Sequence, residues 1–267
     1  MDVVLELADQ YMLDTLYPAS WPREDFSRQL LSVSTLTLLG GYALYLVGAS
    51  LSYVFLFDKR SMKHPRFLQN QVQLEIAYAM KSIPVMMVLN IPFFMAEVRG
   101  HSQLYAQVED FGWMYLAVSV PMFLLFTDML IYWFHRWLHH RLVYATIHKP
   151  HHKWIIPTPF ASHAFHPIDG FIQGLPYHLF VLIFPMHRVL FLAMYMAVNF
   201  WTISIHDGYH VAHNQWLNGA AHHTVHHEEF VFNYGQYFTL WDRLSGSYKE
   251  PSKEPEPSPM KLAKKVN

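Results

Sequence analysis

Long apolar stretches alternate with short polar ones along the first half of the chain. Residues 30–57, 74–97 and 113–134 are each almost continuously apolar. Each is about as long as the roughly 20 residues that an α-helix needs to cross the hydrocarbon core of a bilayer. Short apolar runs are ambiguous between strand and helix, but runs of this length are not. The pattern therefore predicts three membrane-spanning helices.

A fourth apolar region, residues 175–205, is interrupted by polar residues and a proline at positions 184–188. Two full crossings would need about 40 residues, more than this region offers. A helical hairpin that enters the membrane, turns near Pro185 and returns fits the length. The alternative, four buried core helices of a soluble protein, conflicts with the length and continuity of the apolar runs. We therefore predict an all-α integral membrane protein with about four membrane segments, one of them this hairpin.

Charges in the short loops predict how the spans are oriented. The loop 58–66 is basic, whereas residues 1–29 and the loop 97–110 are mainly acidic. Because short basic loops stay on the cytosolic side, we expect residues 1–29 in the lumen and the chain after residue 134 in the cytosol. Residues 249–267, rich in Pro, Lys and Glu, are expected to form a disordered cytosolic tail. The tail ends in a dilysine pattern at 264–265 that resembles an endoplasmic-reticulum retrieval signal.

Composition narrows the function. The net charge of −1 argues against a nucleic-acid partner. The chain has no Cys, which excludes disulfides, thiolate zinc sites and intrinsic iron–sulfur clusters. Its 19 His residues equal Lys and Arg combined, and most of them fall after the third span. The expected chemistry is therefore that of imidazole.

These histidines form four boxes, at residues 135–140, 148–152, 206–210 and 222–227. Residues three and four apart share a face of a helix, so each box directs two or three imidazoles the same way. Neutral imidazole is a good ligand for iron, zinc or copper. A generic His-rich patch would have no reason to repeat helical spacing. The boxes therefore predict a metal centre in a helical cap on the cytosolic side of the membrane.

The number of ligands indicates more than one ion. The candidate metal ligands are His135, His139, His140, His148, His151, His152, His206, His210, His223, His226 and His227. One structural zinc ion takes four ligands, so this set divides more naturally between two ions with four or five nitrogens each. An all-nitrogen site suits iron, and two irons can hold and split dioxygen. We treat the six other singled-out histidines as packing or interfacial residues: His101, His163, His166, His178, His187 and His213.

Asp128 is an acid inside the third predicted span, seven residues before His135 and on the same helical face. Carboxylates commonly hydrogen-bond the free ring nitrogen of a metal-ligating histidine. An intramembrane acid is also a functional candidate by default. Asp128 is therefore a candidate catalytic residue, and a pairing with a polar group on a neighbouring span explains it equally well.

The order and spacing of the boxes resemble the fatty acid hydroxylase superfamily of membrane di-iron enzymes. Within that superfamily, five segments closely resemble the Δ7-sterol 5(6)-desaturases: residues 59–70, 126–137, 148–154, 156–170 and 233–243. The similarity extends over residues 1–248. Together with the hydropathy and charge pattern, the resemblance divides the chain into a lumenal segment (1–29), three spans (30–134), a catalytic domain of the fatty acid hydroxylase type (135–248) that contains the hairpin 175–205, and a tail (249–267).

The resemblance also implies an activity. Members of this group introduce a C5–C6 double bond into a Δ7-sterol, with two iron ions, dioxygen, and electrons from NADH delivered through cytochrome b5 and its reductase. The box ligands carry over onto His135, His139, His148, His151, His152, His223, His226 and His227. His206 matches a further ligand. The choice between His139 and His140 stays open, as does the role of His210.

Three other functions remain to be weighed. A lipid hydroxylase of the same superfamily would share every box. A bis-histidine haem electron carrier needs two axial ligands per haem, which leaves most boxes unexplained. A metal transporter would place its polar residues inside the spans. Because nothing resembles a fused electron carrier, a separate donor must dock, and the basic residues beside the boxes would suit an acidic one.

Overall fold

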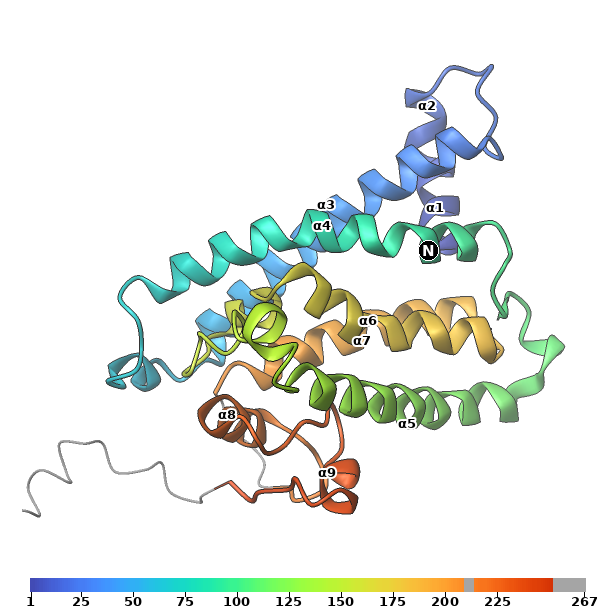
Figure 1. The fold of residues 1–267 in the computed structure, drawn as a ribbon. Coiled ribbons are helices and arrows are strands. Elements are labelled where there is room, and N and C mark those ends of the chain that lie inside the picture. The colour runs from blue at the N-terminus through green and yellow to red at the C-terminus, as the bar shows by residue number, and fades with distance from the viewer. Residues whose placement is uncertain (209–213, 252–267) are drawn as a thin grey trace, which may run out of the picture.

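The computed structural model describes residues 1–208 and 214–251, and these are mostly helical (Figure 1). Four helices are long and apolar enough to cross a membrane: α3 (Phe26–Phe55), α4 (Gln71–Val98), α5 (Gly112–Leu138) and α7 (Arg188–Ile205). Only 17–28% of the residues in their most apolar windows are buried inside the protein. Apolar surface of this extent is not stable in water. The multi-span membrane fold is confirmed, and the soluble interpretation is wrong.

The three predicted spans correspond to α3, α4 and α5, with shifted ends. Asp25 caps α3 by accepting hydrogen bonds from the backbone N–H groups of Ser27 and Arg28, so the helix starts earlier than the apolar run. The last helix of the three, α5, continues to Leu138, one turn beyond the predicted end. The first histidine box therefore begins inside a helix.

The predicted hairpin is confirmed, and it is longer than expected. Its first arm is α6 (Pro167–Ile183), which begins with proline at its first position and is capped by His166. At about 1.5 Å per residue, each arm is roughly 25 Å long. The turn carries β2 (Met186–His187), which pairs in parallel with β1 (Leu104–Tyr105). The tip thus reaches the loop that joins α4 to α5.

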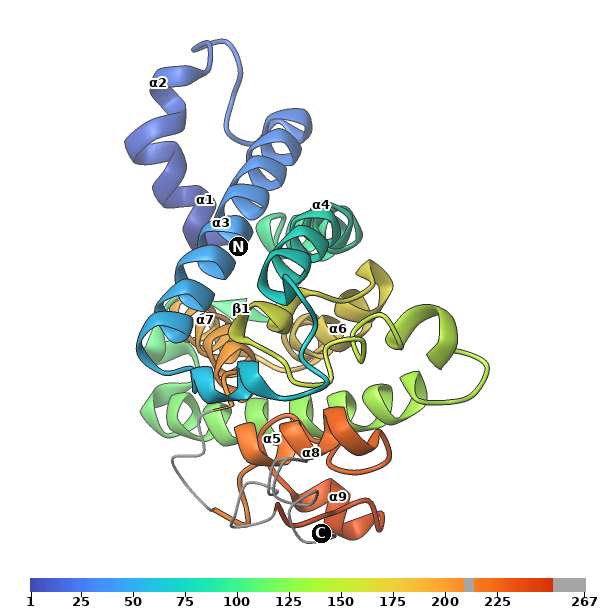
Figure 2. The same ribbon diagram turned by 90° about the vertical axis from the view of Figure 1, so that its left-hand side faces the viewer.

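The remaining elements are short. The chain starts with α1 (Asp2–Ala8), a π-helical turn and α2 (Asp14–Leu16), which project beside α3 in Figures 1 and 2. After the hairpin, α8 (Ala220–Glu229) and α9 (Leu240–Leu244) lie on one side of α5 in both views. The other helical turns are Asp9–Leu13, Lys59–Lys63, Val108–Asp110, Tyr144–His148 and Pro159–His163.

One hydrophobic core fixes the segment that follows the second box. Residues 154–164 of this segment pack against α3, α4 and the end of α7. Two polar contacts secure it to these helices: the Tyr45 hydroxyl donates to the Phe160 carbonyl, and the Gln71 amide donates to the Ile156 carbonyl. The carboxylate of Glu75 accepts a further bond from the Thr158 hydroxyl. The second box is therefore held between the membrane helices and α8.

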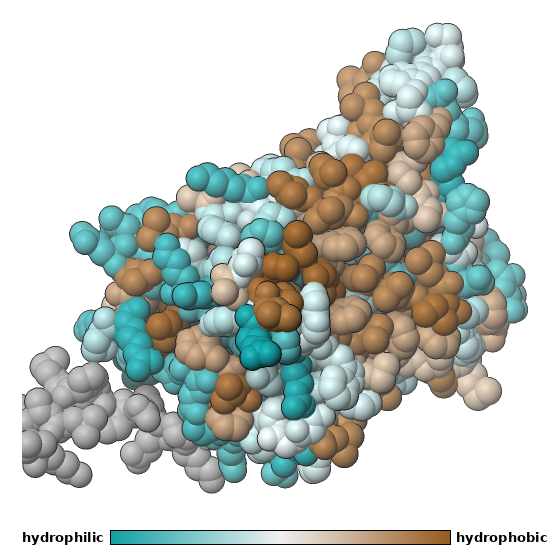
Figure 3. Space-filling model, viewed as in Figure 1, coloured by the Kyte–Doolittle hydropathy of each residue, from teal (hydrophilic) through white to brown (hydrophobic). Residues whose placement is uncertain are grey.

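The surface is divided into a hydrophobic region and hydrophilic margins (Figure 3). Hydrophobic residues gather over the long helices in the centre and centre-right of the view, whereas hydrophilic residues gather at the left margin, along much of the lower edge and at the upper right margin. The left margin carries the turn Lys59–Lys63, and the lower edge carries α8 and α9. The histidine boxes lie at this polar end of the helix bundle.

Candidate metal centre

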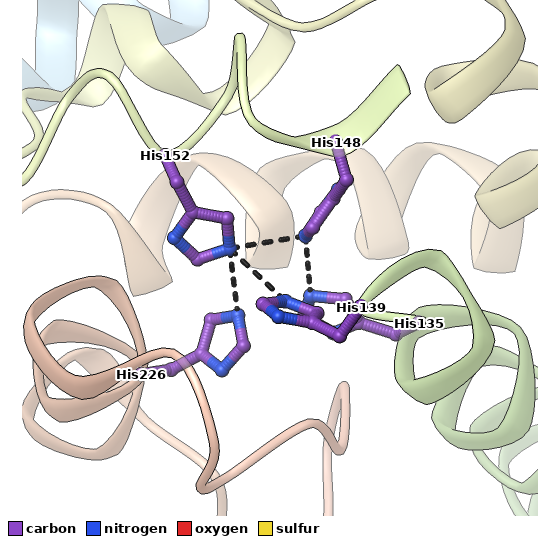
Figure 4. A group of neighbouring side chains, drawn as sticks. All are labelled: His135, His139, His148, His152 and His226. Carbon is purple, nitrogen blue, oxygen red and sulfur yellow. Dashed lines mark hydrogen bonds between the residues drawn. The ribbon is translucent and has the colours of Figure 1, made fainter. Parts of the chain in front are cut away.

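The box histidines come together in two groups, each of which could hold a metal ion. The first consists of His135, His139, His148, His152 and His226 (Figure 4). The second consists of His151, His206, His223 and His227. In each group, one ring nitrogen per residue lies within 4.8 Å of all the others. Adjacent residues of one turn, such as His226 and His227 on α8, thus contribute to different groups.

The five rings of the first group point their Nε2 atoms at one another. The Nε2 atom of His148 lies 3.0 Å from that of His135 and 3.0 Å from that of His152. The Nε2 atom of His152 also lies 3.1 Å from that of His139 and 3.2 Å from that of His226. Figure 4 draws these four approaches as dashed lines.

The hydrogen-bond partners of the Nδ1 atoms, on the other side of each ring, determine which tautomer is present. The Nδ1 atom of His135 is 2.9 Å from the Tyr234 carbonyl oxygen, and that of His226 is 2.7 Å from the Phe232 carbonyl oxygen. A carbonyl oxygen can only accept, so both Nδ1 atoms carry the proton of the neutral ring. Their Nε2 atoms therefore present lone pairs to the centre of the group. Lone pairs that converge in this way repel one another unless a cation lies between them, so the donor set fits a metal ion.

Asp169 orients a third ring of the first group. Its Oδ2 atom accepts a hydrogen bond of 2.7 Å from His148 Nδ1, and both side chains are fully buried. A buried carboxylate behind an imidazole fixes the ring and raises its basicity as a ligand. Asp169 is not among the site residues predicted from the sequence. The available signal was an acid in the first turn of an apolar helix, just after Pro167.

The second group is built from three segments. His206 ends α7, and its Nε2 atom lies 3.0 Å from that of His223 and 3.5 Å from that of His151. The Nε2 atom of His227 lies 3.1 Å from that of His223. The Nδ1 atom of His206 donates to the Thr202 carbonyl at 2.7 Å, so its Nε2 also presents a lone pair.

Burial keeps these rings neutral. It lowers the pKa of His226 to about 3, although the hydrogen bond to the Phe232 carbonyl opposes the shift. In the same way, burial lowers the pKa of His206 to about 4. Neutral imidazole is the form that binds metals. His226 and His206 are therefore in the ligand form at neutral pH.

Two candidates from the sequence analysis lie outside both groups. His140 is exposed, and its Nδ1 atom accepts a long hydrogen bond from the Leu142 backbone. Asp128 does not contact a cluster histidine: its Oδ1 atom accepts backbone hydrogen bonds from residues 236–238. It thereby holds the segment whose Tyr234 carbonyl orients His135. His210 lies outside the described residues, as does His213.

A second missed acid supports the same segment. Asp242 is fully buried and accepts hydrogen bonds from the backbone N–H groups of Tyr234 and Gly235, both at 2.9 Å. Burial raises the pKa of its carboxyl group. Asp128 and Asp242 together fix the loop after α8. Five backbone N–H groups donate to these two carboxyl groups, so the loop is firmly placed.

A mainly apolar cavity of about 390 Å³ opens onto the histidines. Its inner end is lined by His135 of the first group and by three residues of the second, His151, His206 and His223. From there it runs between α3, α4, α6 and α7, and it is lined by residues as distant as Leu36 and Phe94. This volume lies in the range of small-ligand sites, about 300–1,000 Å³. An elongated apolar molecule can therefore reach both groups.

Comparisons with known proteins agree with this site. Residues 120–247 match the model of the fatty acid hydroxylase family. The chain is 56% identical to lathosterol oxidase of Mus musculus over 94% of this chain and 86% of that one, and 52% identical to lathosterol oxidase of Homo sapiens over 100% and 91%. It is 52% identical to the Delta(7)-sterol 5(6)-desaturase of Schizosaccharomyces pombe over 94% and 84%. No solved structure matches it. The chain belongs to the fatty acid hydroxylase family, in the group formed by lathosterol oxidases and Δ7-sterol 5(6)-desaturases.

Proposed function

We propose that this protein is a membrane oxidoreductase that introduces the C5–C6 double bond into a Δ7-sterol. One observation carries the proposal: histidines of both groups line one apolar cavity between the membrane helices. The names of relatives that share 52–56% of its residues support the same reaction.

The two histidine groups would hold two non-haem iron ions. The ligands would be His135, His139, His148, His152 and His226 for one ion, and His151, His206, His223 and His227 for the other. An all-imidazole donor set suits iron, and the bound ions would supply the activation of dioxygen. Groups of five and four imidazoles do not fit a haem, which takes two axial ligands.

The protein's own part is to bind, orient and exclude water. The apolar cavity walls hold the sterol and keep water from the histidines. The contacts of Asp169, Tyr234 and Phe232 hold three rings in their ligand tautomers. In the overall reaction the sterol loses two hydrogens, and dioxygen, two protons and two electrons from a donor complete the formation of two water molecules.

The electrons would come from NADH through cytochrome b5 and its reductase. Four exposed basic residues lie beside the boxes: Arg136, Arg141, Lys149 and Lys153. Complementary charge speeds the encounter of partners and orients them. This face would therefore dock an acidic electron donor close to the first histidine group.

Product analysis tests the reaction. The chain is expressed in a host that lacks sterol C5-desaturase, and the sterols are identified by mass spectrometry. We expect a Δ5,7-sterol that has lost two hydrogens. A product that has gained one oxygen would instead indicate a lipid hydroxylase of the same family, and the absence of any new sterol would contradict both.

Elemental analysis tests the cofactor. We expect about two iron ions per purified chain, from the number of imidazoles in the two groups. One zinc ion and no iron would contradict the proposal.

We also propose an endoplasmic-reticulum location with the histidine groups on the cytosolic side. The basic turn Lys59–Lys63 lies at the same end of the bundle as the boxes and supports this orientation. Single cysteines that replace the exposed Lys153 and Lys249 should react with an impermeant thiol reagent from the cytosol, and one that replaces Gln103 only from the lumen. Labelling of Lys153→Cys and Lys249→Cys from opposite sides would rule out a shared site.

A further inference from the structure

The cavity wall carries a hydrogen-bond acceptor that the metal centre does not use. Gln173, on α6, lines the cavity, and its Nε2 atom donates a hydrogen bond of 2.6 Å to Asp169 Oδ1. Because a carboxylate only accepts, this bond fixes the orientation of the amide. The amide oxygen, Oε1, is the remaining polar atom, and it has no hydrogen-bond partner among the described residues.

Asp169 connects this amide to the first histidine group. Asp169 accepts from Gln173 through Oδ1 and from His148 through Oδ2. Gln173 is thus two hydrogen bonds away from a ring of the metal centre. Any ligand atom bound by its Oε1 atom would be held close to the histidines.

The proposed C5–C6 desaturation sets where the sterol hydroxyl must lie. In a 3-hydroxysterol, three bonds of about 1.5 Å join the hydroxyl oxygen to C5, so these two atoms are within about 4 Å of each other. If C5 and C6 reach the histidines, the hydroxyl must be bound at the same end of the cavity. The aliphatic side chain then extends toward the apolar far end, near Leu36 and Phe94.

We propose that Gln173 Oε1 accepts a hydrogen bond from the sterol 3-hydroxyl and so places C5 and C6 beside the two histidine groups. This inference rests on the proposed function and adds the residue that selects and orients the substrate. A site that hydrogen-bonds a substrate hydroxyl discriminates strongly against an analogue without it, because the polar group of the site is then left unpaired.

The two asparagines of the cavity fit this role less well. The Asn199 amide nitrogen donates to the Tyr195 carbonyl of its own helix, and no hydrogen bond among the described residues connects Asn199 to a histidine of either group. Asn90 Oδ1 is buried and has no partner among the described residues. However, its amide nitrogen bonds only the Met86 carbonyl of its own helix, so no contact connects Asn90 to a histidine. Asn90 is therefore the matched control.

The experiment compares a 3-hydroxy-Δ7-sterol with the same sterol lacking the hydroxyl group. Wild type, Gln173→Met, Gln173→Leu and Asn90→Leu are purified, and their metal content is measured. For each protein, kcat and KM are determined with both sterols, and binding of each radiolabelled sterol is measured without reductant. We expect kcat/KM of wild type and of Asn90→Leu to be about ten- to hundredfold higher with the hydroxysterol. This ratio corresponds to the loss of one buried hydrogen bond when the hydroxyl is absent. In both Gln173 variants this preference should largely disappear, mainly through KM and binding.

The outcomes separate the inference from the proposed function. Unchanged preference in the Gln173 variants, or an equal fall with both sterols together with lost metal, would overturn the assignment of Gln173. Loss of the preference in Asn90→Leu would move the hydroxyl site to α4 and also overturn it. If wild type forms no Δ5,7-sterol, the proposed function fails, and the binding data alone then decide whether Gln173 recognises the hydroxyl.

Discussion

The two histidine groups differ in how firmly their rings are held. In the five-residue group, His135, His148 and His226 each donate from Nδ1 to a fixed oxygen. In the four-residue group, only His206 has such a partner among the described residues, whereas the Nδ1 atoms of His151, His223 and His227 have none. The five-residue group also contains one buried Nδ1 atom without a partner, that of His152. Partners of this kind change metal affinity by about 10–100-fold. The five-residue group should therefore hold its ion more tightly.

The groups also differ in their access to the cavity. Three members of the four-residue group line it, but from the five-residue group only His135 does so among the described residues. Two of the basic residues proposed to dock the electron donor, Arg136 and Lys149, directly follow His135 and His148 of the five-residue group. We infer a division of tasks: the five-residue group is rigid and closer to the donor, and the four-residue group is more adaptable and closer to the substrate.

The largest effect is expected from removing one ligand of each group. His226→Ala and His227→Ala change neighbouring residues of α8 but affect different groups. Each should abolish turnover and lower the iron content from about two to about one ion per chain. Membrane insertion should be unchanged because it depends on the apolar spans. Full activity in either variant would show that its group is structural, and His101→Ala, in an exposed residue after α4, is the silent control.

Much of this arrangement was predictable from the sequence because it follows from local pattern. Apolar runs of bilayer length fixed three helices, and the break at 184–188 located the hairpin turn. Helical spacing located the boxes. The pairing of boxes was not predictable, because neighbours such as His151 and His152 contribute to different groups only once the turn after α5 is folded.

The roles of Asp128 and Asp169 could not be predicted from the sequence. Asp128 was noticed for its position in a span, but its partners lie 108–110 positions further along the chain. Asp169 and Gln173 stand out as polar residues in an apolar helix, but the local pattern does not show that they lie beside His148. Such contacts depend on how α6 packs against the second box, which no sequence period encodes.

A smaller effect is expected when the firm group loses its carboxylate. Asp169→Asn keeps the shape of the side chain but removes the charge that faces His148 Nδ1. We expect iron affinity at the five-residue group to fall about 10–100-fold, with little change at the other. Competition with a coloured chelator measures this. Asp128→Asn, which keeps an acceptor for the 236–238 backbone, should leave both affinities nearly unchanged, and an equal loss in both variants would contradict the orienting role of Asp169.

Chelation of the wild-type protein should show the difference directly. We expect two phases of iron loss, separated by about tenfold in affinity, with the four-residue group emptied first. His227→Ala should lack the weaker phase, and His226→Ala the tighter one. A single phase in wild type would mean that the missing Nδ1 partners of the four-residue group have no consequence for its ion.

The smallest effect is expected at His140, and it decides an alternative that the sequence left open. Because α5 extends to Leu138, His135 and His139 lie four residues apart and face the same centre, whereas His140 points to solvent. His140→Ala should therefore keep iron content and turnover within about twofold, since surface substitutions usually change stability by no more than about 0.5 kcal/mol. His139→Ala, one residue away, should lose turnover and the iron of the five-residue group. The reverse result would exchange the two histidines and require a different end for α5.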